Sequence, residues 1–311
     1  MIISPFGRYA FGVLATVAVL SGCGGAQPPL GAPGAMHADH NGSRMRPNLS
    51  GQDLLYVTDG EIVKIYTYPR GKFVAPLGNF GSVYGMCSDA AGDVFIPEYF
   101  QNEILEYAHG GSSPIATINT IYDFPSGCSI DPTTGNLATA TYSKLEVFRP
   151  SPSGWSLPTT YTDSDLGLIN FCAYDGSGNL FVDGNDGSYQ LAELPAGSST
   201  FTNITLGKSI NKPSDLMWDG HDIAIASGRF TGKFPAPIYQ FSISGSYGDL
   251  VHLTLLFRAG GQLHQFWIQG DKIIGTHDGG EAIWNYPKGE LATKLMRGVG
   301  GAVTVSVASS H

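Results

Sequence analysis

The sequence is poor in charge and in cysteine. Only 14% of its 311 residues are charged and four are cysteines, none of them in a zinc-type spacing. A formal net charge of −9 argues against sequence-independent nucleic-acid binding, because such binding needs a basic surface that displaces counterions. Amphipathic runs with a 3.6-residue period, which helices would require, are also missing. The hydrolase motifs G-x-S-x-G and H-E-x-x-H are absent as well.

Glycine, proline and aromatic residues are abundant instead. With 42 glycines, 19 prolines and 11% aromatic residues, the composition favours an all-β chain whose short strands are joined by tight turns. A turn aspartate recurs at Asp89, Asp131, Asp175 and Asp219, at intervals of 42, 44 and 44 residues. Such a period with short strands inside it is typical of β-propeller blades, and residues 51–311 have room for six of them.

Each repeat is expected to hold four strands, named a to d from the inside outward. Strand a precedes the turn aspartate and b follows it. Strand c alternates apolar and polar residues, as at residues 103–107 and 144–148, and d is the least regular. The first strands after residue 50 match b, c and d without an a strand, whereas residues 302–307 form a lone alternating strand. The sequence therefore predicts a six-bladed, four-stranded propeller in which the C-terminal strand completes the first blade and removes open sheet edges.

Residues 1–22 carry the pattern of a targeting signal. Arg8 precedes an apolar stretch, residues 11–20, that is too short to span a bilayer. The LSGC motif that ends at Cys23 resembles the bacterial lipobox, which implies lipidation of Cys23. The alternative is an ordinary secretory signal cut near Gly22. Residues 23–50 are rich in Gly, Pro and Ala and are expected to form a flexible tether.

The expected location follows from that pattern. Gly24, directly after Cys23, is similar to the residue found in lipoproteins sent on to the outer membrane. We therefore expect a bacterial envelope protein, periplasmic or surface-exposed, that contacts the membrane through its lipid anchor only and holds the propeller of residues 51–311 away from the bilayer.

Motifs inside the repeats carry a resemblance to known propellers. Residues 125–131 (PSGCSID), 135–137 (GNL) and 145–148 (LEVF) resemble NHL-type repeats and are similar to six-bladed gluconolactonase and regucalcin-like propellers. The resemblance spans residues 51–308. For gluconolactonase-like enzymes it implies a divalent cation at the channel mouth, held by carboxylates and an asparagine. Asn170 and Asp215 match that set in kind, whereas the early glutamate of the family has no counterpart near Asp53.

One end of the propeller is expected to hold the functional residues. In an up-and-down blade the d–a and b–c loops emerge at one end of the ring, here called the mouth, and the a–b turns at the other, here called the turn end. Because loops on a rigid scaffold often carry function, the mouth supplies the ligand-face candidates. These are Tyr84, Glu98, Asn170, Asp183, Asp186, Asp215, Gln265, His277 and Asp278. They are accompanied by Asp59, Tyr99, Phe100, Gln101, Asn102, Ser126, Tyr142, Gly184, Asn185, Arg229, Phe230 and Gly300.

Two functional hypotheses follow. The first is a binding module whose polar mouth holds a protein, peptide or glycan, because a propeller is evident without a complete catalytic set. The second is a calcium-dependent, gluconolactonase-like hydrolase with Asn170 and Asp215 as metal ligands. Calcium needs several oxygen ligands, so the second hypothesis requires a further carboxylate to converge with these two residues. No other cofactor is expected.

Three cysteines lie within the predicted propeller. Cys128 and Cys172 stand three residues before their turn aspartates, whereas Cys87 stands two before and is expected on the other face of its strand. An oxidising envelope would permit a Cys128–Cys172 disulfide. Inner strands of separate blades are, however, expected to lie too far apart for one. We therefore expect small buried residues that pack between blades.

Overall fold

Short β-strands joined by turns make up the part of the chain that the computed structural model describes, namely residues 49, 51–78, 80–122, 124–227, 235–259, 263–277, 279–296 and 301–308. These residues all fall in one compact unit, which spans residues 31–311. Outside the described residues lie the predicted signal, nearly all of the predicted tether, Cys23, Arg229, Phe230, Asp278 and Gly300. Among the described residues, no helix is long and apolar enough to cross a membrane.

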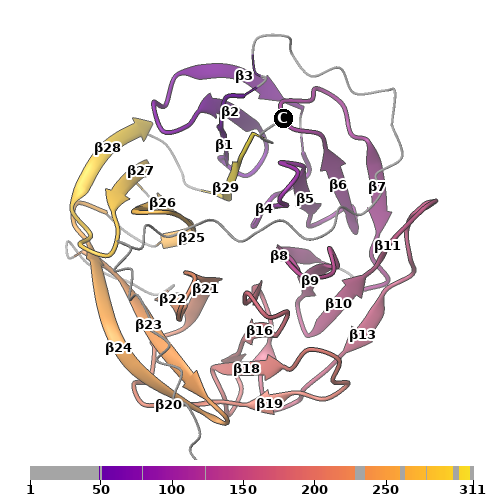
Figure 1. Ribbon diagram of the computed structural model, residues 1–311, viewed down its shortest axis with the longest axis vertical. Helices are drawn as coiled ribbons and strands as arrows, with labels where there is room; N and C mark the ends of the chain where they lie inside the picture. Colours follow the sequence, from indigo (N-terminus) through magenta and orange to yellow (C-terminus); the bar gives the residue numbers. More distant parts are fainter. Residues whose placement is uncertain are drawn as a thin grey trace, which may run out of the picture. The chain divides into compact units, whose positions relative to one another are not determined.

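Six sheets stand around a central axis as the blades of a propeller (Figure 1). Blade 1 contains β29 (Val303–Ser306), β1 (Leu54–Thr58), β2 (Val63–Thr67) and β3 (Phe73–Leu77). Blade 2 contains β4 (Cys87–Ser88), β5 (Val94–Glu98), β6 (Glu103–Tyr107) and β7 (Ala116–Asn119). Blade 3 contains β8 (Pro125–Ile130), β9 (Leu137–Thr141), β10 (Lys144–Phe148) and β13 (Thr159–Tyr161).

The second half of the ring repeats this arrangement. Blade 4 contains β15 (Cys172–Tyr174), β16 (Leu180–Asp183), β18 (Leu191–Leu194) and β19 (Thr202–Asn203). Blade 5 contains β21 (Pro213–Trp218), β22 (Ile223–Ser227), β23 (Ala236–Ser244) and β24 (Tyr247–Leu256), with β20 (Thr205–Leu206) added at its outer edge. Blade 6 contains β25 (Leu263–Gln269), β26 (Lys272–His277), β27 (Gly280–Asn285) and β28 (Leu291–Met296).

Two small ladders decorate the blades. β11 (Pro150–Ser151) pairs with β12 (Gly154–Trp155) in an antiparallel hairpin between β10 and β13. β14 (Gly167–Leu168) pairs in parallel with β17 (Asn185–Asp186), which ties the connection into blade 4 to a b–c loop of the same blade. The strand order within each blade confirms the predicted all-β, six-bladed fold class.

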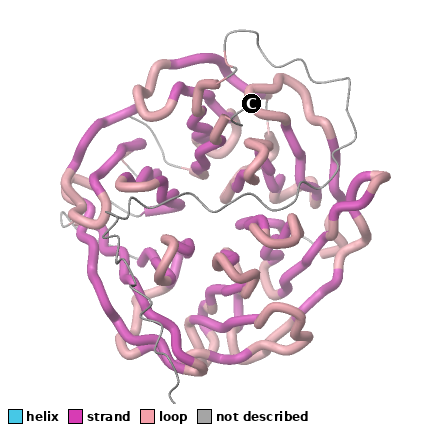
Figure 2. Tube along the Cα trace, viewed as in Figure 1, coloured by secondary structure: helices cyan, strands magenta, loops and turns pink. Residues whose placement is uncertain are grey.

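The ends of the described chain close the ring. β29 pairs antiparallel with β1, so that Val57 lies opposite Val303 and Leu54 opposite Ser306. Figure 2 shows this C-terminal strand inside the blade that the first strands form. The main-chain N–H of Ala308 also donates to Asp53 Oδ1 at 3.0 Å. The predicted closure is confirmed.

The core is divided among the gaps between blades. Six hydrophobic clusters of buried residues are present in the described chain, one between each pair of neighbouring blades. Between blades 1 and 2, for example, Leu54 and Ile65 meet Val94 and Ile96, and all four are fully buried. Burying such a side chain stabilises a fold by about 1.5–3 kcal/mol. Because each blade packs against a neighbour on both faces, inner strands such as β1 and β5 are buried along their whole length.

A disulfide joins Cys87 to Cys128, which corrects the predicted arrangement of the cysteines. Their Cα atoms are 5.6 Å apart, because the inner strands of neighbouring blades converge near the axis. Neighbouring blades meet through opposite faces, so cysteines that bond across the gap must point in opposite senses. Cys172 instead faces blade 3, the sense in which Cys128 faces blade 2, and it is a buried free thiol. The expectation that these strands lie too far apart was wrong.

Candidate functional site

A pocket of about 600 Å³ opens at the mouth of the ring. Its lining comes from d–a connections, b–c loops and the first residues of inner strands. It combines aromatic and apolar residues, here called the apolar wall, with polar residues, here called the polar wall. The lining residues are Tyr84, Tyr99, Ser126, Leu168, Asn170, Phe171, Asn185, Asp186, Lys212, Pro213, Ser214 and His264. This volume lies within the range of small-molecule sites in proteins.

A cluster of five aromatic side chains continues the apolar wall onto the rim of blades 2 and 3. We call Tyr84, Tyr99, Phe100, Phe124 and Tyr142 the aromatic platform. Ring centroids are 4.7 Å apart for Tyr84–Tyr99, 4.8 Å for Tyr99–Phe124 and 6.4 Å for Phe124–Tyr142. Four members are substantially exposed: Tyr84 by 49%, Phe100 by 60%, Phe124 by 37% and Tyr142 by 48%. Mutual ring packing holds the platform together without covering it.

Hydrogen bonds beneath the platform fix the loop that carries Phe124. The main-chain N–H of Phe124 donates to Asn102 Oδ1 at 3.1 Å. The N–H groups of Ile121 and Tyr122 each donate to Glu146 Oε1 at 3.0 Å. Glu146 is fully buried, and burial raises the pKa of its carboxyl group. The platform is therefore positioned by the scaffold before any ligand arrives.

Backbone strain is concentrated at the same end. The described chain contains six non-glycine residues with positive φ, and all of them lie in mouth loops: Asn102, Phe124, Tyr142, Asp186, Lys212 and Arg258. Two of them belong to the platform and two to the pocket. The left-handed region is unfavourable for bulky side chains, so such residues persist only where the surrounding structure enforces them.

Asp183 organises the polar wall from below. Its Oδ1 accepts the N–H groups of Asn170 and Phe171, both at 2.8 Å, and its Oδ2 accepts Asn185 Nδ2 at 3.0 Å. Asn185 Nδ2 also donates to the carbonyl of Pro213 at 3.1 Å. Burial disfavours the carboxylate and raises the pKa of Asp183 to about 7. Asp183 therefore holds pocket residues in place and is itself fully buried.

Asp215 and Gln265 connect blades across the channel. Asp215 Oδ2 accepts the N–H of Phe266 at 2.8 Å. Gln265 Oε1 accepts the N–H of Val303 at 2.8 Å, and its Nε2 donates to the carbonyl of Met86 at 3.0 Å. Both side chains are almost completely buried. Their positions fit structural ties that complete the ring.

Ser214 and His264 line the pocket in place of Asp215 and Gln265. Register shifts between Pro213 and Asp215, and between Leu263 and Phe266, interrupt the alternation at the start of β21 and β25. A bulge of this kind re-aims the side chains next to it. The Ser214 hydroxyl is buried and has no hydrogen-bond partner in the described chain.

The remaining candidates lie at the mouth but outside the pocket lining. Glu98 Oε2 accepts the N–H of Gly81 at 3.1 Å, and burial raises the pKa of this buried carboxyl. His277 Nδ1 accepts the N–H of Gly279 at 2.9 Å, and its ring lies 6.0 Å from that of Trp284. Asp278 lies outside the described residues.

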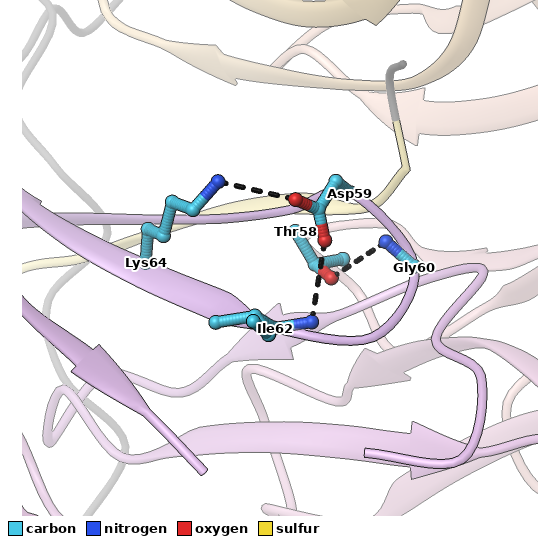
Figure 3. A network of polar contacts seen from close by, with 5 residues as sticks. All are labelled: Thr58, Asp59, Gly60, Ile62 and Lys64. Atoms are coloured by element: carbon cyan, nitrogen blue, oxygen red, sulfur yellow. Dashed lines mark hydrogen bonds and ion pairs between the residues drawn. The ribbon is translucent and has the colours of Figure 1, made fainter. Parts of the chain in front are cut away.

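Asp59 is engaged within its own turn. Its Oδ2 accepts Lys64 Nζ at 3.1 Å and its Oδ1 accepts the N–H of Ile62 at 3.3 Å (Figure 3). The Thr58 hydroxyl accepts the N–H of Gly60 in the same turn (Figure 3). These contacts close the b–c loop of blade 1, so Asp59 has a local structural role.

The structure thus separates the predicted ligand-face residues into two groups. Tyr84, Asn170 and Asp186 line the pocket, and Asp186 faces Lys212 at 3.5 Å across its rim. Glu98, Asp183, Asp215, Gln265 and His277 are buried around it. Binding by any of them stays a prediction.

Sequence reasoning missed Phe124, Lys212, Ser214 and His264. Phe124 could have been found, because it directly precedes β8 in a d–a loop, as Tyr84 closely precedes β4. The positions of Ser214 and His264 in the pocket lining depend on bulges that no sequence pattern predicts.

The described residues contain no group of three or more His, Cys, Asp or Glu side chains arranged to hold a metal ion. Asp183 lies close enough to Asp215 for its charge to contribute to the raised pKa of Asp215, after the larger effect of burial. Asp183 is therefore the further carboxylate near Asn170 and Asp215 that a calcium site would need. Its two oxygens, however, already accept three hydrogen bonds.

Comparison with known proteins supports the fold and nothing finer. No protein-family model matches the sequence, and no curated protein matches it. Many solved chains are similar, among them one in a crystal structure of a nidogen/laminin complex, with a TM-score of 0.65 and 11% identity. That match covers 83% of this chain and 100% of the other. The protein is a six-bladed β-propeller, and its resemblance to NHL and gluconolactonase-like propellers stays a prediction.

Proposed function

We propose that the propeller is a binding module that holds its ligand at the mouth. The observation that carries this proposal is the aromatic platform beside the pocket. Exposed apolar patches on soluble proteins often mark interaction sites, and aromatic residues are enriched among those that dominate binding energy. A pocket with convergent polar groups directly beside such a patch supplies orientation as well as affinity.

Local strain supports the same interpretation. Phe124 and Tyr142 keep large side chains at positions where glycine would avoid the strain, with φ of 67° and 57°. Their rings do not fill a core, because both are more than a third exposed. A role outside the fold accounts for their presence better than a role within it.

A paired set of variants tests the proposal. The double variant Tyr84→Ala/Tyr142→Ala removes two exposed rings of the platform. The matched control Phe73→Ala/Leu157→Ala removes two exposed apolar side chains elsewhere on the ring. Peptide and glycan libraries are screened against the full chain and both variants. Ligands should be lost from the platform variant and kept by the control; binding that survives in the platform variant would contradict the proposal.

The calcium-dependent hydrolase remains the alternative. Calorimetric titration of the full chain with CaCl₂, followed by lactone hydrolysis assays, separates the two functions. Calcium binding and turnover that both disappear in Asp215→Asn would favour the hydrolase over the binding module. Because Asp215 also ties blade 5 to blade 6, the unfolding midpoint of the variant must be measured alongside.

We further propose that the protein is lipidated at Cys23 and anchored in the bacterial envelope, at the outer membrane. The disulfide between Cys87 and Cys128 supports an oxidising compartment, where such bonds persist. Palmitate labelling and membrane fractionation of wild type and Cys23→Ala test the anchor. Label and membrane association should both disappear in the variant; a labelled variant would exclude Cys23 as the site.

A further inference from the structure

We propose that the mouth binds a neutral oligosaccharide, whose sugar rings stack on the aromatic platform while their hydroxyls meet the polar wall of the pocket. This inference rests on the proposed binding function and names its ligand class. It is drawn from the chemistry of the pocket and platform residues.

The pocket is amphipathic in the way that a pyranose is. Tyr84, Tyr99 and Phe171 supply aromatic surface to the lining. Asn170, Asn185 and Ser214 supply amide and hydroxyl groups to the same lining. A pyranose ring presents a face of C–H groups with partial positive charge, which the negative face of an aromatic ring attracts, and a rim of hydroxyls that both donate and accept.

The polar groups beside the rings are largely uncommitted. The Ser214 hydroxyl has no partner within the described residues, although it is buried. The bonds of Asn185 use its Nδ2, which leaves Oδ1 as an acceptor. Buried polar groups normally find partners, so rotation of the Ser214 hydroxyl toward the pocket that this residue lines would let a ligand hydroxyl satisfy it.

The charge at the rim favours a neutral ligand. Lys212 and Asp186 carry opposite charges and face each other at 3.5 Å, so their fields largely cancel. Both side chains are about half exposed or more, with relative exposures of 50% and 63%. An anionic ligand would have to compete with Asp186 for Lys212, on a protein whose formal net charge is −9.

The platform extends beyond the pocket, because Phe100, Phe124 and Tyr142 do not line it. From Tyr84 at the pocket, Tyr99, Phe124 and Tyr142 follow in steps of 4.7, 4.8 and 6.4 Å between centroids. A ligand that fills the pocket and reaches Tyr142 must therefore be a chain of sugars. A monosaccharide would use only the pocket.

An extended peptide finds less to bind. Peptides that add a strand need unpaired main-chain groups along a sheet edge. Beneath the platform, the N–H groups of Phe124, Ile121 and Tyr122 already donate to Asn102 and Glu146. Recognition here must therefore use side chains, as stacking on sugar rings does.

The test is calorimetric titration of the full chain with neutral tetra- to hexasaccharides of several linkages, an anionic oligogalacturonate and a proline-rich peptide library. We expect at least one neutral oligosaccharide to bind, and Tyr142→Ala to weaken it by about tenfold, because one stacking contact is lost. Tyr142→Phe keeps the ring and should stay within about twofold of wild type. Tyr247→Ala removes an exposed tyrosine of blade 5 and should change nothing.

The outcomes separate this inference from the proposed function. Platform-dependent peptide binding without sugar binding overturns the inference and leaves the binding module standing. A preference for the anionic oligosaccharide, or sugar binding indifferent to Tyr142→Ala, also overturns the inference. If no ligand of either class depends on the platform, both proposals fall. An unchanged unfolding midpoint for Tyr142→Ala excludes misfolding as the cause of any loss.

Discussion

The two ends of the ring solve the same geometrical problem with different residues. Every strand connection must reverse the chain, and many do so through a residue with positive φ. At the turn end, each such residue in the described chain is a glycine, as at Gly245 with φ of 59°. At the mouth, six of them carry side chains, including Phe124 and Tyr142, beside glycines such as Gly60 and Gly167.

This difference separates an end whose residues serve to form the hairpins, the turn end, from an end whose residues fit a binding role, the mouth. Glycine reaches positive φ without a steric penalty, so the turn end has the residues that a stable hairpin needs. Its aspartates serve the same purpose: Asp175 Oδ1 accepts the N–H groups of Ser177 and Asn179. The mouth accepts strain, exposed rings and an unpaired hydroxyl, which a scaffold alone would not require.

The largest expected effect comes from the disulfide that joins the inner strands of blades 2 and 3. Replacing both Cys87 and Cys128 by serine reopens a loop of 41 residues. The expected loss is about 3–4 kcal/mol in the free energy of unfolding, because the unfolded chain regains the entropy of that loop. Hydrogen exchange should rise first in the inner strands of blades 2 and 3, which the bond joins. Equal acceleration around Asp175 would contradict a local role.

A smaller effect concerns pH. The mouth end holds Asp183 and Glu281, whose pKa values burial raises to about 7. The charge of Lys64 lowers the pKa of Glu281 and so opposes the effect of burial, but Lys64 donates its hydrogen bond to Asp59 (Figure 3). One carboxyl oxygen of Glu281 has no hydrogen-bond partner in the described chain. A raised pKa in the fold means that the folded state binds protons more tightly than the unfolded state. The stability that these two groups contribute should therefore be fully present below pH about 4 and be lost as the pH rises through about 7.

Glu281→Gln isolates one of these groups. Position 281 cannot ionise in this variant. Between pH 4.5 and 7 the free energy of unfolding of the variant should therefore fall by on the order of 2 kcal/mol less than that of the wild type. Chemical unfolding at a series of pH values measures the slope, with the exposed Asp249→Asn as the control. An unaltered slope in Glu281→Gln would show that this carboxyl is not the source.

The repeat allowed most of the fold to be predicted from the sequence. Turn aspartates at intervals of 42 to 44 residues indicated the blades. The missing inner strand of the first blade and the lone C-terminal strand indicated the closure. Strands β6 and β10 lie where alternation of apolar and polar residues placed them, at residues 103–107 and 144–148. These features depend on local sequence patterns that occur again in each repeat, so each repeat supports the interpretation of the next.

The site could be predicted only in part, because it depends on relations between blades. To predict the disulfide, one has to know that neighbouring blades meet through opposite faces. To predict that Ser214 and His264 line the pocket, one has to know the bulges in β21 and β25. Tyr84 and Asn170 were found because their loops open at the mouth in any up-and-down propeller, whatever the register.

At the turn end, Gly245→Ala tests the role of glycine. A Cβ at this position meets nothing within 4 Å, so the only penalty is the positive φ of 59°. The variant should lose about 1 kcal/mol of stability, measured by chemical unfolding, and keep full ligand binding. A loss of ligand binding would mean that the two ends are not independent.

Tyr142→Gly is the mirror image of that variant and has the smallest expected effect on stability. The backbone at φ of 57° is relieved of a bulky residue, while an exposed ring and its contact with Phe124 are lost. The two terms are each about 1 kcal/mol and opposite in sign, so unfolding should change by less than about 0.5 kcal/mol either way. Ligand binding should nevertheless fall as it does in Tyr142→Ala. If the variant instead unfolds as readily as the disulfide variant, Tyr142 stabilises the fold, and the contrast between a structural end and a binding end fails at the residue chosen to represent it.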